Sequence, residues 1–177
     1  KKYEENIDFV IESTYANSNK IREALHLPKI VRQYELMELL KVRIPHDTFG
    51  IINMDGPFTS VMPLGDDGIF TVTHAKESVL ERIMTDDFDD NILSFGKLRT
   101  NRENIIREST KDFPILKYAE FIESMNITKC IKVNVDDTDE RPSEITHHGN
   151  GVYSVFSGKI ITSVDAAEKM AGILLKN

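Results

Sequence analysis

Residues 151–174 read GVYSVFSGKIITSVDAAEKMAGIL, and this stretch decides the fold that we expect for the chain. The nearly continuous apolar run over 151–156 is typical of a buried strand. After the turn Ser157-Gly158-Lys159, the apolar spacing over 163–176 predicts an amphipathic helix. Its expected apolar side consists of Val164, Ala167, Met170, Ala171, Leu174 and Leu175. The chain therefore closes with a strand, a short glycine turn and a helix.

The closing turn is also the most informative candidate for a binding site. Gly158 would let backbone amides approach a ligand, and the start of the following helix offers unpaired N–H groups and a positive dipole end. These features suit a phosphate or another electron-rich group. In the alternative interpretation, Gly158 only permits a tight turn and Lys159 is a solvated surface charge.

The beginning of the chain carries a similar unit. Residues 7–13 form a short apolar run with β-branched side chains, and a polar turn over 17–19 leads into a short helical segment over 20–25. Parallel β-α units have this arrangement, in which each strand leads into a helix. We therefore expect the two ends of the chain to pack together, with the strands at 7–13 and 151–156 in one sheet.

The middle of the chain has a different pattern. Residues 34–44 fit helical and strand periods almost equally, and three apolar runs between 49 and 73 are separated by turn signals that predict an antiparallel meander. Thr100 and Glu103 form a capping-box pattern for a helix to about Ser109, and Asp112 with Pro114 predicts a second helix to about Met125. Alternation over 127–135 predicts a further strand. These elements together indicate the α+β class.

Composition limits the partners of the chain. Its 22 Lys and Arg and 29 Asp and Glu give a formal net charge of −7, which argues against a nucleic-acid partner. The longest apolar runs are only a few residues, whereas a membrane-spanning helix needs roughly 20. The single cysteine, Cys130, permits no internal disulfide, so the reducing cytoplasm is the expected compartment.

Three other features could carry chemistry, but each has a simpler interpretation. His147 and His148 could bind a metal, yet neighbours in a strand point to opposite faces, so we expect no metal site. Cys130 could be a nucleophile, but nothing nearby in the sequence activates it, and a structural or surface thiol is favoured. Arg141 could bind a carboxylate of a substrate or simply neutralise the acidic residues 136–140.

The order and spacing of several segments resemble the later half of the FAD-dependent oxidoreductases of the D-amino acid oxidase superfamily. The segment IDFVIESTYAN at 7–17 is similar to the strand that returns to the flavin domain. The other matching segments are 34–45, Met54 to Phe58, Met62 to Gly65, Asp139 to Ser143, and Gly149 to Ile160 with the helix that follows. The resemblance extends over nearly the whole chain.

The resemblance implies a particular division of the chain. Residues 34–135 would form a substrate-binding domain with a mixed, largely antiparallel sheet and helices. Residues 1–33 and 136–177 would be the closing β-α elements of an FAD-binding Rossmann-like domain. The intact protein would move a hydride from an amine- or hydroxyl-bearing carbon of a small anionic substrate to FAD.

The resemblance also implies roles for individual residues. Those expected near the flavin are Ser13, Thr14, Tyr15, Ser157, Gly158, Lys159, Ile160 and Ile161. Those expected at the substrate are Arg141, as an anchor for an anionic group or alternatively a neighbour of the flavin, and Met54, Phe58 and Ser60, as part of the pocket wall.

One feature of the superfamily is absent from this sequence. The glycine-rich fingerprint that holds the FAD pyrophosphate is not formed by any of the nine glycines. We therefore expect the later portion of a longer protein, inactive by itself. The alternatives are a non-catalytic α+β binding or interaction module that has lost flavin binding, and a flavin-independent enzyme that uses His147 or His148 as a base.

Overall fold

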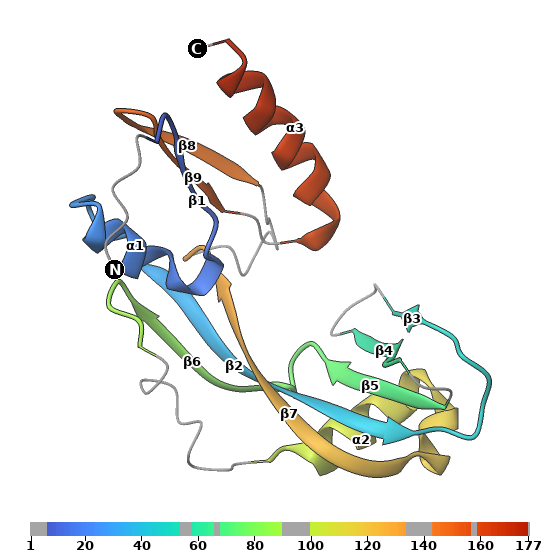
Figure 1. The fold of residues 1–177 in the computed structure, drawn as a ribbon. Coiled ribbons are helices and arrows are strands. Elements are labelled where there is room, and N and C mark those ends of the chain that lie inside the picture. Colours follow the sequence, from blue (N-terminus) through green and yellow to red (C-terminus); the bar gives the residue numbers. More distant parts are fainter. Residues whose placement is uncertain are drawn as a thin grey trace, which may run out of the picture. The chain divides into compact units, whose positions relative to one another are not determined.

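The computed structural model describes residues 7–53, 58–65, 68–89, 100–133, 143–156 and 159–176. These residues form an α+β fold with two sheets and three α-helices (Figure 1), as the sequence predicts. They divide into two compact units, which are described separately. Unit 1 comprises the described residues within Lys1–Tyr34, Met84–Phe88 and Cys130–Asn177, and unit 2 comprises those within Glu35–Ile83 and Asp89–Lys129.

Unit 1 is built on a three-stranded sheet that joins the two ends of the chain. Its strand order is β1 (Val10–Glu12), β9 (Val152–Phe156), β8 (Glu144–Gly149). Strand β1 runs parallel to β9, with Ile11 opposite Tyr153, whereas β8 is antiparallel to β9. The expected pairing of the strands at 7–13 and 151–156 in one sheet is therefore confirmed.

Helices cover both faces of this sheet (Figure 1). Strand β1 leads through the 3-10 turn η1 (Tyr15–Asn17) into α1 (Ser18–Ala24), and β9 is followed by η3 (Ile160–Thr162) and α3 (Ser163–Leu174). Because neighbouring residues of a strand face opposite sides, Ile11 lies toward α3 and Glu12 toward α1. Each face of the sheet is thus lined by its own helix.

The apolar side of α3 differs from the one that the sequence predicts. Ala166 and Met170 are buried, but Val164 is 64% exposed and Leu175 is 87% exposed. The buried stripe is therefore rotated by about one residue, because α3 meets the sheet through Ala166 and Met170. The remaining predicted residues face a groove that is described below.

The hairpin between β8 and β9 sets the position of β1. Asn150 and Gly151 have φ values of 49° and 72°, as expected of a two-residue type I′ turn. A Cβ atom on Gly151 would lie 2.3 Å from the carbonyl oxygen of Asp8. The Gly151 carbonyl in turn accepts a hydrogen bond of 3.0 Å from the Val10 N–H. Only glycine allows the N-terminal segment to approach this closely.

We predict that Gly151→Ala destabilises the protein more than Gly149→Ala does. Gly149 also has a positive φ, +89°, but a Cβ there would meet nothing within 4 Å, so its substitution costs only the backbone strain, about 1–2 kcal/mol. Gly151→Ala adds a backbone clash that costs about 1–3 kcal/mol more. Urea midpoints of the two variants measure the difference. Equal losses of stability would contradict the close approach.

Most of unit 2 is a larger sheet centred on one long strand. Its order is β3 (Ile51–Ile52), β4 (Thr59–Pro63), β5 (Ile69–His74), β2 (Arg32–Arg43), β6 (Val79–Thr85), and β7 (Glu120–Ile131) also pairs with β2. Strands β3, β4 and β5 pair antiparallel, which confirms the predicted meander. The ambiguous segment at 34–44 is therefore a strand.

The core of unit 2 lies between this sheet and two short helical elements. Helix α2 (Arg102–Asp112) and the 3-10 helix η2 (Pro114–Tyr118) contribute Ile105 and Leu116 to it. The sheet contributes Leu40, Val42, Ile44, Val61, Phe70 and Val72.

Two local predictions about this region are wrong. The helix expected from Asp112 to about Met125 ends at Tyr118, and the chain continues as β7, because the long strand β2 offers a partner along its edge. The capping box of Thr100 and Glu103 is not formed either. The helix N-cap is Asn101, which makes no capping hydrogen bond through its side chain.

Instead, the buried carboxylate of Glu38 on β2 accepts hydrogen bonds from the residues at the start of α2. Thr100 Oγ1 donates to Glu38 Oε1 at 2.6 Å, and the Asn101 N–H donates to Glu38 Oε2 at 2.7 Å. Ser124 Oγ on β7 donates to Glu38 Oε1 at 2.5 Å. One carboxylate therefore joins two strands and a helix, and its negative charge lies at the positive end of the helix dipole.

We predict that Glu38→Gln lowers the free energy of unfolding by about 1–3 kcal/mol, because the amide supplies one acceptor oxygen where three donors need two. The matched control is Glu123→Gln, which removes the carboxylate of a surface pair with Lys41 and should cost less than about 1 kcal/mol. Urea denaturation of both variants provides the measurement. A Glu38→Gln loss no larger than that of the control would refute this role.

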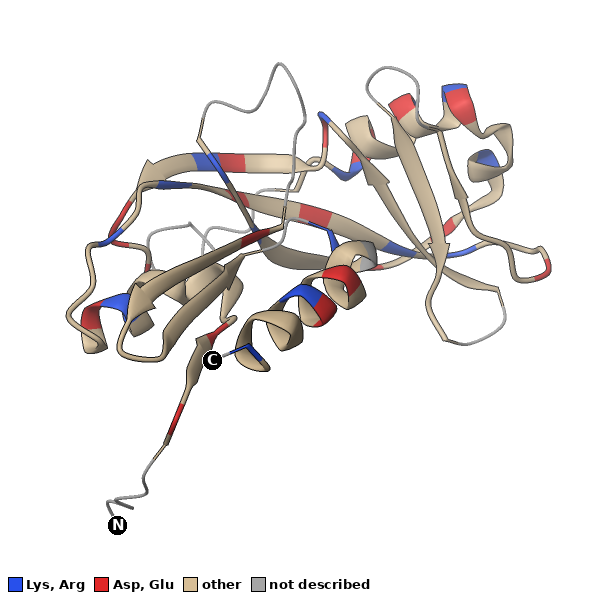
Figure 2. Cartoon of the chain, turned by 90° about the horizontal axis from the view of Figure 1, so that it is seen from above, with Lys and Arg blue, Asp and Glu red and all other residues tan. Residues whose placement is uncertain are grey.

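The surface carries both signs of charge. Figure 2 shows basic and acidic residues interspersed along the helices and strands of the described chain. Within that same part, no helix is long and apolar enough to cross a membrane.

Candidate functional site

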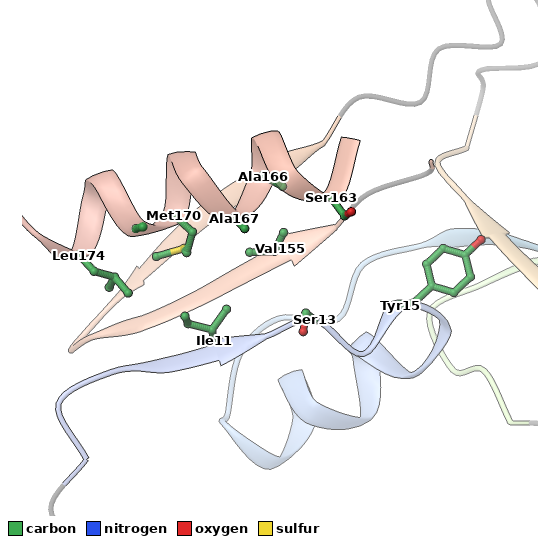
Figure 3. A pocket seen from close by; sticks show the side chains of 10 residues that line it. Ile11, Ser13, Tyr15, Val155, Ser163, Ala166, Ala167, Met170 and Leu174 are labelled. Carbon is green, nitrogen blue, oxygen red and sulfur yellow. The ribbon is translucent and has the colours of Figure 1, made fainter. Parts of the chain in front are cut away.

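Unit 1 contains an apolar groove between the sheet and α3 (Figure 3). Ile11 and Val155 lie on the sheet side, facing Ala167, Met170 and Leu174 of the helix. The groove has a volume of about 530 Å³. Ser13, Tyr15 and Ser163 also line it, at the end where β1 and β9 lead into their helices. Two of the residues expected at the cofactor, Ser13 and Tyr15, are therefore brought together with the start of α3.

The turn that follows β1 is held by a buried carboxylate. Glu12 is 5% exposed, and its Oε1 accepts hydrogen bonds from the Thr14 N–H and the Thr14 hydroxyl, both at 2.7 Å. Tyr15 then takes a left-handed conformation with a φ of 55°, which is rare for a residue with a side chain. The exposed residues Ser13 and Thr14 therefore occupy a fixed turn.

Tyr15 is fixed at both ends of its side chain. Its ring stacks on Phe156 at the end of β9, with centroids 5.8 Å apart and planes inclined by 14°. Its hydroxyl oxygen accepts a hydrogen bond of 2.9 Å from the Cys130 N–H. These contacts offset the backbone strain at Tyr15 and hold the turn beside the end of β9.

The segment after β9 begins the last helix without a side-chain cap. Lys159 is extended and exposed, and its carbonyl accepts hydrogen bonds from the Thr162 N–H at 3.2 Å and the Thr162 hydroxyl at 2.8 Å. Thr162 is the N-cap of α3 and makes no capping bond to it. Ile160 is 85% exposed. Ser163, the first residue of α3, lies at the groove, and its N–H donates to the Ile160 carbonyl.

The other predicted site residues lie elsewhere. Phe58 and Ser60 belong to unit 2, where both are half-buried and Ser60 of β4 pairs with Ile52 and Thr73. Ile161 is part of η3. Outside the described residues lie Met54, Arg141, Ser157 and Gly158.

The two histidines of β8 have separate surroundings, as their adjacent positions in a strand predict. The His147 ring stacks on Tyr153, with centroids 4.5 Å apart. His148 Nε2 lies 2.9 Å from Ser154 Oγ and 3.4 Å from Arg22 Nη1. Burial, together with the neighbouring Arg22, lowers the pKa of His148, so its ring is neutral at neutral pH. Among the described residues, no three potential metal ligands gather.

Sequence reasoning missed the buried charges of unit 1. Glu12, Arg22 and Arg32 are all less than one-tenth exposed. Extending the period-two pattern of 34–44 backward would have placed Arg32 on the same strand face as Tyr34. Glu12 and Arg22 carry no comparable signal, because their environment is formed by residues distant in the sequence.

Cys130 is fully buried, which agrees with a structural thiol, and burial raises its pKa to about 11. We therefore predict that 5,5′-dithiobis(2-nitrobenzoate) labels the native thiol far more slowly than the urea-unfolded one at about pH 8, where an ordinary thiol is already partly ionised.

The unfolded chain has the lower thiol pKa, about 8.5, so the stability that the neutral thiol contributes is present below that pH and is lost toward pH 11.

The matched control for this prediction is Ser13→Cys, which places a second thiol at an exposed position. In that variant one thiol should be labelled rapidly and one slowly. Rapid labelling of Cys130 in the native wild-type chain would show that the thiol is accessible.

Comparison with known proteins relates this fold to oxidoreductases. The chain aligns with the FAD dependent oxidoreductase PA4991 from Pseudomonas aeruginosa at a TM-score of 0.60 and 14% identity, over 96% of this chain and 45% of that chain. Iminodiacetate oxidase (IdaA) from Chelativorans sp. BNC1 aligns at a TM-score of 0.49 and 12% identity, over 85% of this chain and 37% of that one. No family model and no curated protein sequence matches.

These alignments concern the fold. Nearly the whole chain has the fold of one part of an FAD-dependent oxidoreductase, and it spans less than half the length of either protein.

Proposed function

We propose that this chain is the part of a flavin-dependent oxidoreductase that holds the flavin end of FAD and forms the substrate-binding domain. The observation that carries the proposal is the fold shared with PA4991 over 96% of the chain, with candidate residues at the ends of two parallel strands. In sheets with parallel strands, ligands bind outside the carboxyl ends of the strands. Ser13 to Tyr15 follow β1, and Lys159 and Ile160 follow β9.

The described residues fit the flavin end of the cofactor. Ser13 and Thr14 would offer hydroxyl groups on a fixed turn, and Lys159 would supply a positive charge for the electron-rich pyrimidine side of the ring. The exposed Ile160 would cover part of the ring face. The amides that follow Ser163 in the first turn of α3, which lack a side-chain cap, would add hydrogen-bond donors. Ser157, Gly158 and Ile161 are proposed to complete this contact.

The described residues do not fit the pyrophosphate and adenosine of FAD. Those groups require a glycine-rich loop between a strand and a helix, which this sequence does not contain. Within unit 1, β1 is an edge strand of the described sheet. Ile11 of β1 and Ala167 of α3 are exposed along the groove. An unpaired edge and an apolar groove suit the docking of a further β-α unit. We infer that the glycine-rich half is supplied by another segment, in a D-amino acid oxidase-like arrangement.

The reaction proposed for the intact protein is oxidation of a small anionic substrate. Bound FAD would supply the hydride acceptor for a carbon that bears an amine or a hydroxyl group. Phe58, Ser60 and Met54 would form part of the substrate wall, and Arg141 would bind its anionic group with a bidentate guanidinium. These residues would orient the substrate and exclude water. The compartment that we propose for the protein is the cytoplasm, as expected from its single cysteine.

We predict that the chain binds the flavin end weakly and retains no FAD. Titration of the ¹⁵N-labelled chain with flavin mononucleotide should shift the amide signals of Thr14, Tyr15, Lys159 and Ile160. Adenosine monophosphate is the matched control ligand and should leave them unchanged. After incubation with FAD and desalting, the visible flavin band should be absent, because the few contacts at the ring do not offset the entropy lost on binding.

Two results would count against this function. If flavin mononucleotide shifts no signal at these positions, the chain is better described as a binding or interaction module. If a stoichiometric flavin band survives desalting, the chain builds a complete cofactor site, and the requirement for another segment is wrong.

A further inference from the structure

The face of the three-stranded sheet opposite the groove encloses a second, polar cavity. It lies within unit 1 between the sheet and α1 and has a volume of about 50 Å³. Its polar lining includes Arg22, Arg32, Glu12, Ser18, Thr146 and Ser154. Ser13, Lys159 and Ile160, which are proposed to contact flavin, are not among the residues that line it. The cavity is therefore distinct from the proposed flavin contact.

Arg32 is a buried cation whose side chain has no recorded polar partner among the described residues. Its residue exposure is 7%, and its Nε has no hydrogen-bond acceptor among the described residues. The contact recorded for its guanidinium is with the Phe156 ring, whose centroid lies 4.0 Å from Cζ. A guanidinium carries five N–H donors, and leaving buried donors unpaired is costly. The buried Nε–H of Arg32 therefore needs a hydrogen-bond acceptor that the described protein atoms do not supply.

Arg22 adds a second positive charge to the same cavity. It is 6% exposed, its Nε donates to the Pro28 carbonyl at 2.6 Å, and its Nη1 lies 3.4 Å from His148 Nε2. Neither guanidinium forms an ion pair with a carboxylate of the described chain. Both arginines therefore retain donors that can point toward one bound group.

The two acidic residues at the cavity are engaged in other contacts. Glu12 Oε1 accepts two hydrogen bonds from Thr14, and Glu144 pairs with Lys132. The lining itself holds two cations, Arg22 and Arg32, and two carboxylates, Glu12 and Glu144. Because Lys132, which is not part of the lining, already pairs with Glu144, the two arginines exceed the remaining carboxylate. The hydroxyl groups of Ser18, Thr146 and Ser154 add neutral donors.

We propose that this cavity binds a small oxyanion, phosphate or a short carboxylate, between Arg32 and Arg22. A water molecule needs about 10–15 Å³ of such space, so the cavity has room for a group of a few heavy atoms but not for a nucleotide. Guanidinium groups match the planar forks of carboxylate and phosphate oxygens. The bound oxyanion satisfies the buried donors of Arg32 and joins the sheet to α1.

The direct test observes the arginine side chain itself. In the ¹⁵N-labelled 177-residue chain, the Nε–H signal of Arg32 is followed while inorganic phosphate or acetate replaces chloride at constant ionic strength. We expect a saturable shift of this signal with at least one of the two oxyanions, and the one that binds more tightly identifies the ligand class. A shift that is absent, or equally large with chloride alone, overturns the proposal and leaves water as the occupant.

A second measurement compares thermal unfolding with and without phosphate. Phosphate stabilises most proteins through exclusion from their surface, so the specific effect is the part that a variant removes. Arg32→Met should lose it, whereas Arg107→Met, which removes the same charge from an exposed position on α2, should keep it. Equal stabilisation of both variants and the wild type contradicts the site. If Arg32→Met does not fold, the wild-type titration decides alone.

Discussion

The parallel pairing of β1 with β9 is the contact on which the rest of unit 1 depends. It brings the turn at Ser13 to Tyr15 beside the segment that opens α3, and it requires the glycine at position 151, where the backbone of Asp8 passes too close for any side chain. Since adjacent residues of a strand face opposite sides, the same pairing turns Ile11 into an apolar groove and Glu12 into a polar cavity. One strand of three residues thus contributes to two chemically different sites.

The buried charged side chains of β2 differ in whether they have polar partners among the described residues. Glu35 is paired with Arg82 Nη2 at 2.8 Å and Lys129 Nζ at 3.0 Å, and Glu38 accepts hydrogen bonds from three donors. These carboxylates are fully partnered, as expected of buried charges with a structural role. Arg32, at the start of the same strand, has no such partner in the described chain. This contrast is the physical reason for assigning Arg32 to binding and Glu38 to stability.

The predictable parts of the fold are those whose partners are close in sequence or whose apolar pattern is continuous. The meander, β9 and the existence of α3 follow from such patterns. Local patterns do not predict where η2 ends, at Tyr118, or how α2 is capped, because both depend on contacts with β2. The residue of β2 that binds the start of α2, Glu38, is 62 residues from Thr100. The same limit applies to the sites. Ser13 and Tyr15 follow a recognisable strand, whereas the environment of Arg22 and Arg32 is assembled only by the tertiary fold.

The joining of the two chain ends in one sheet has a consequence for biosynthesis. A ribosome makes β1 well before β9, so Phe9 and Ile11 have no β9 to pack beside until the intervening chain has been synthesised. The meander of unit 2, built from neighbouring segments, meets no such delay. During that interval β1 exposes an apolar edge, which is the kind of segment that chaperones shield from aggregation. The meander of unit 2 can therefore form before β1 meets its partner β9.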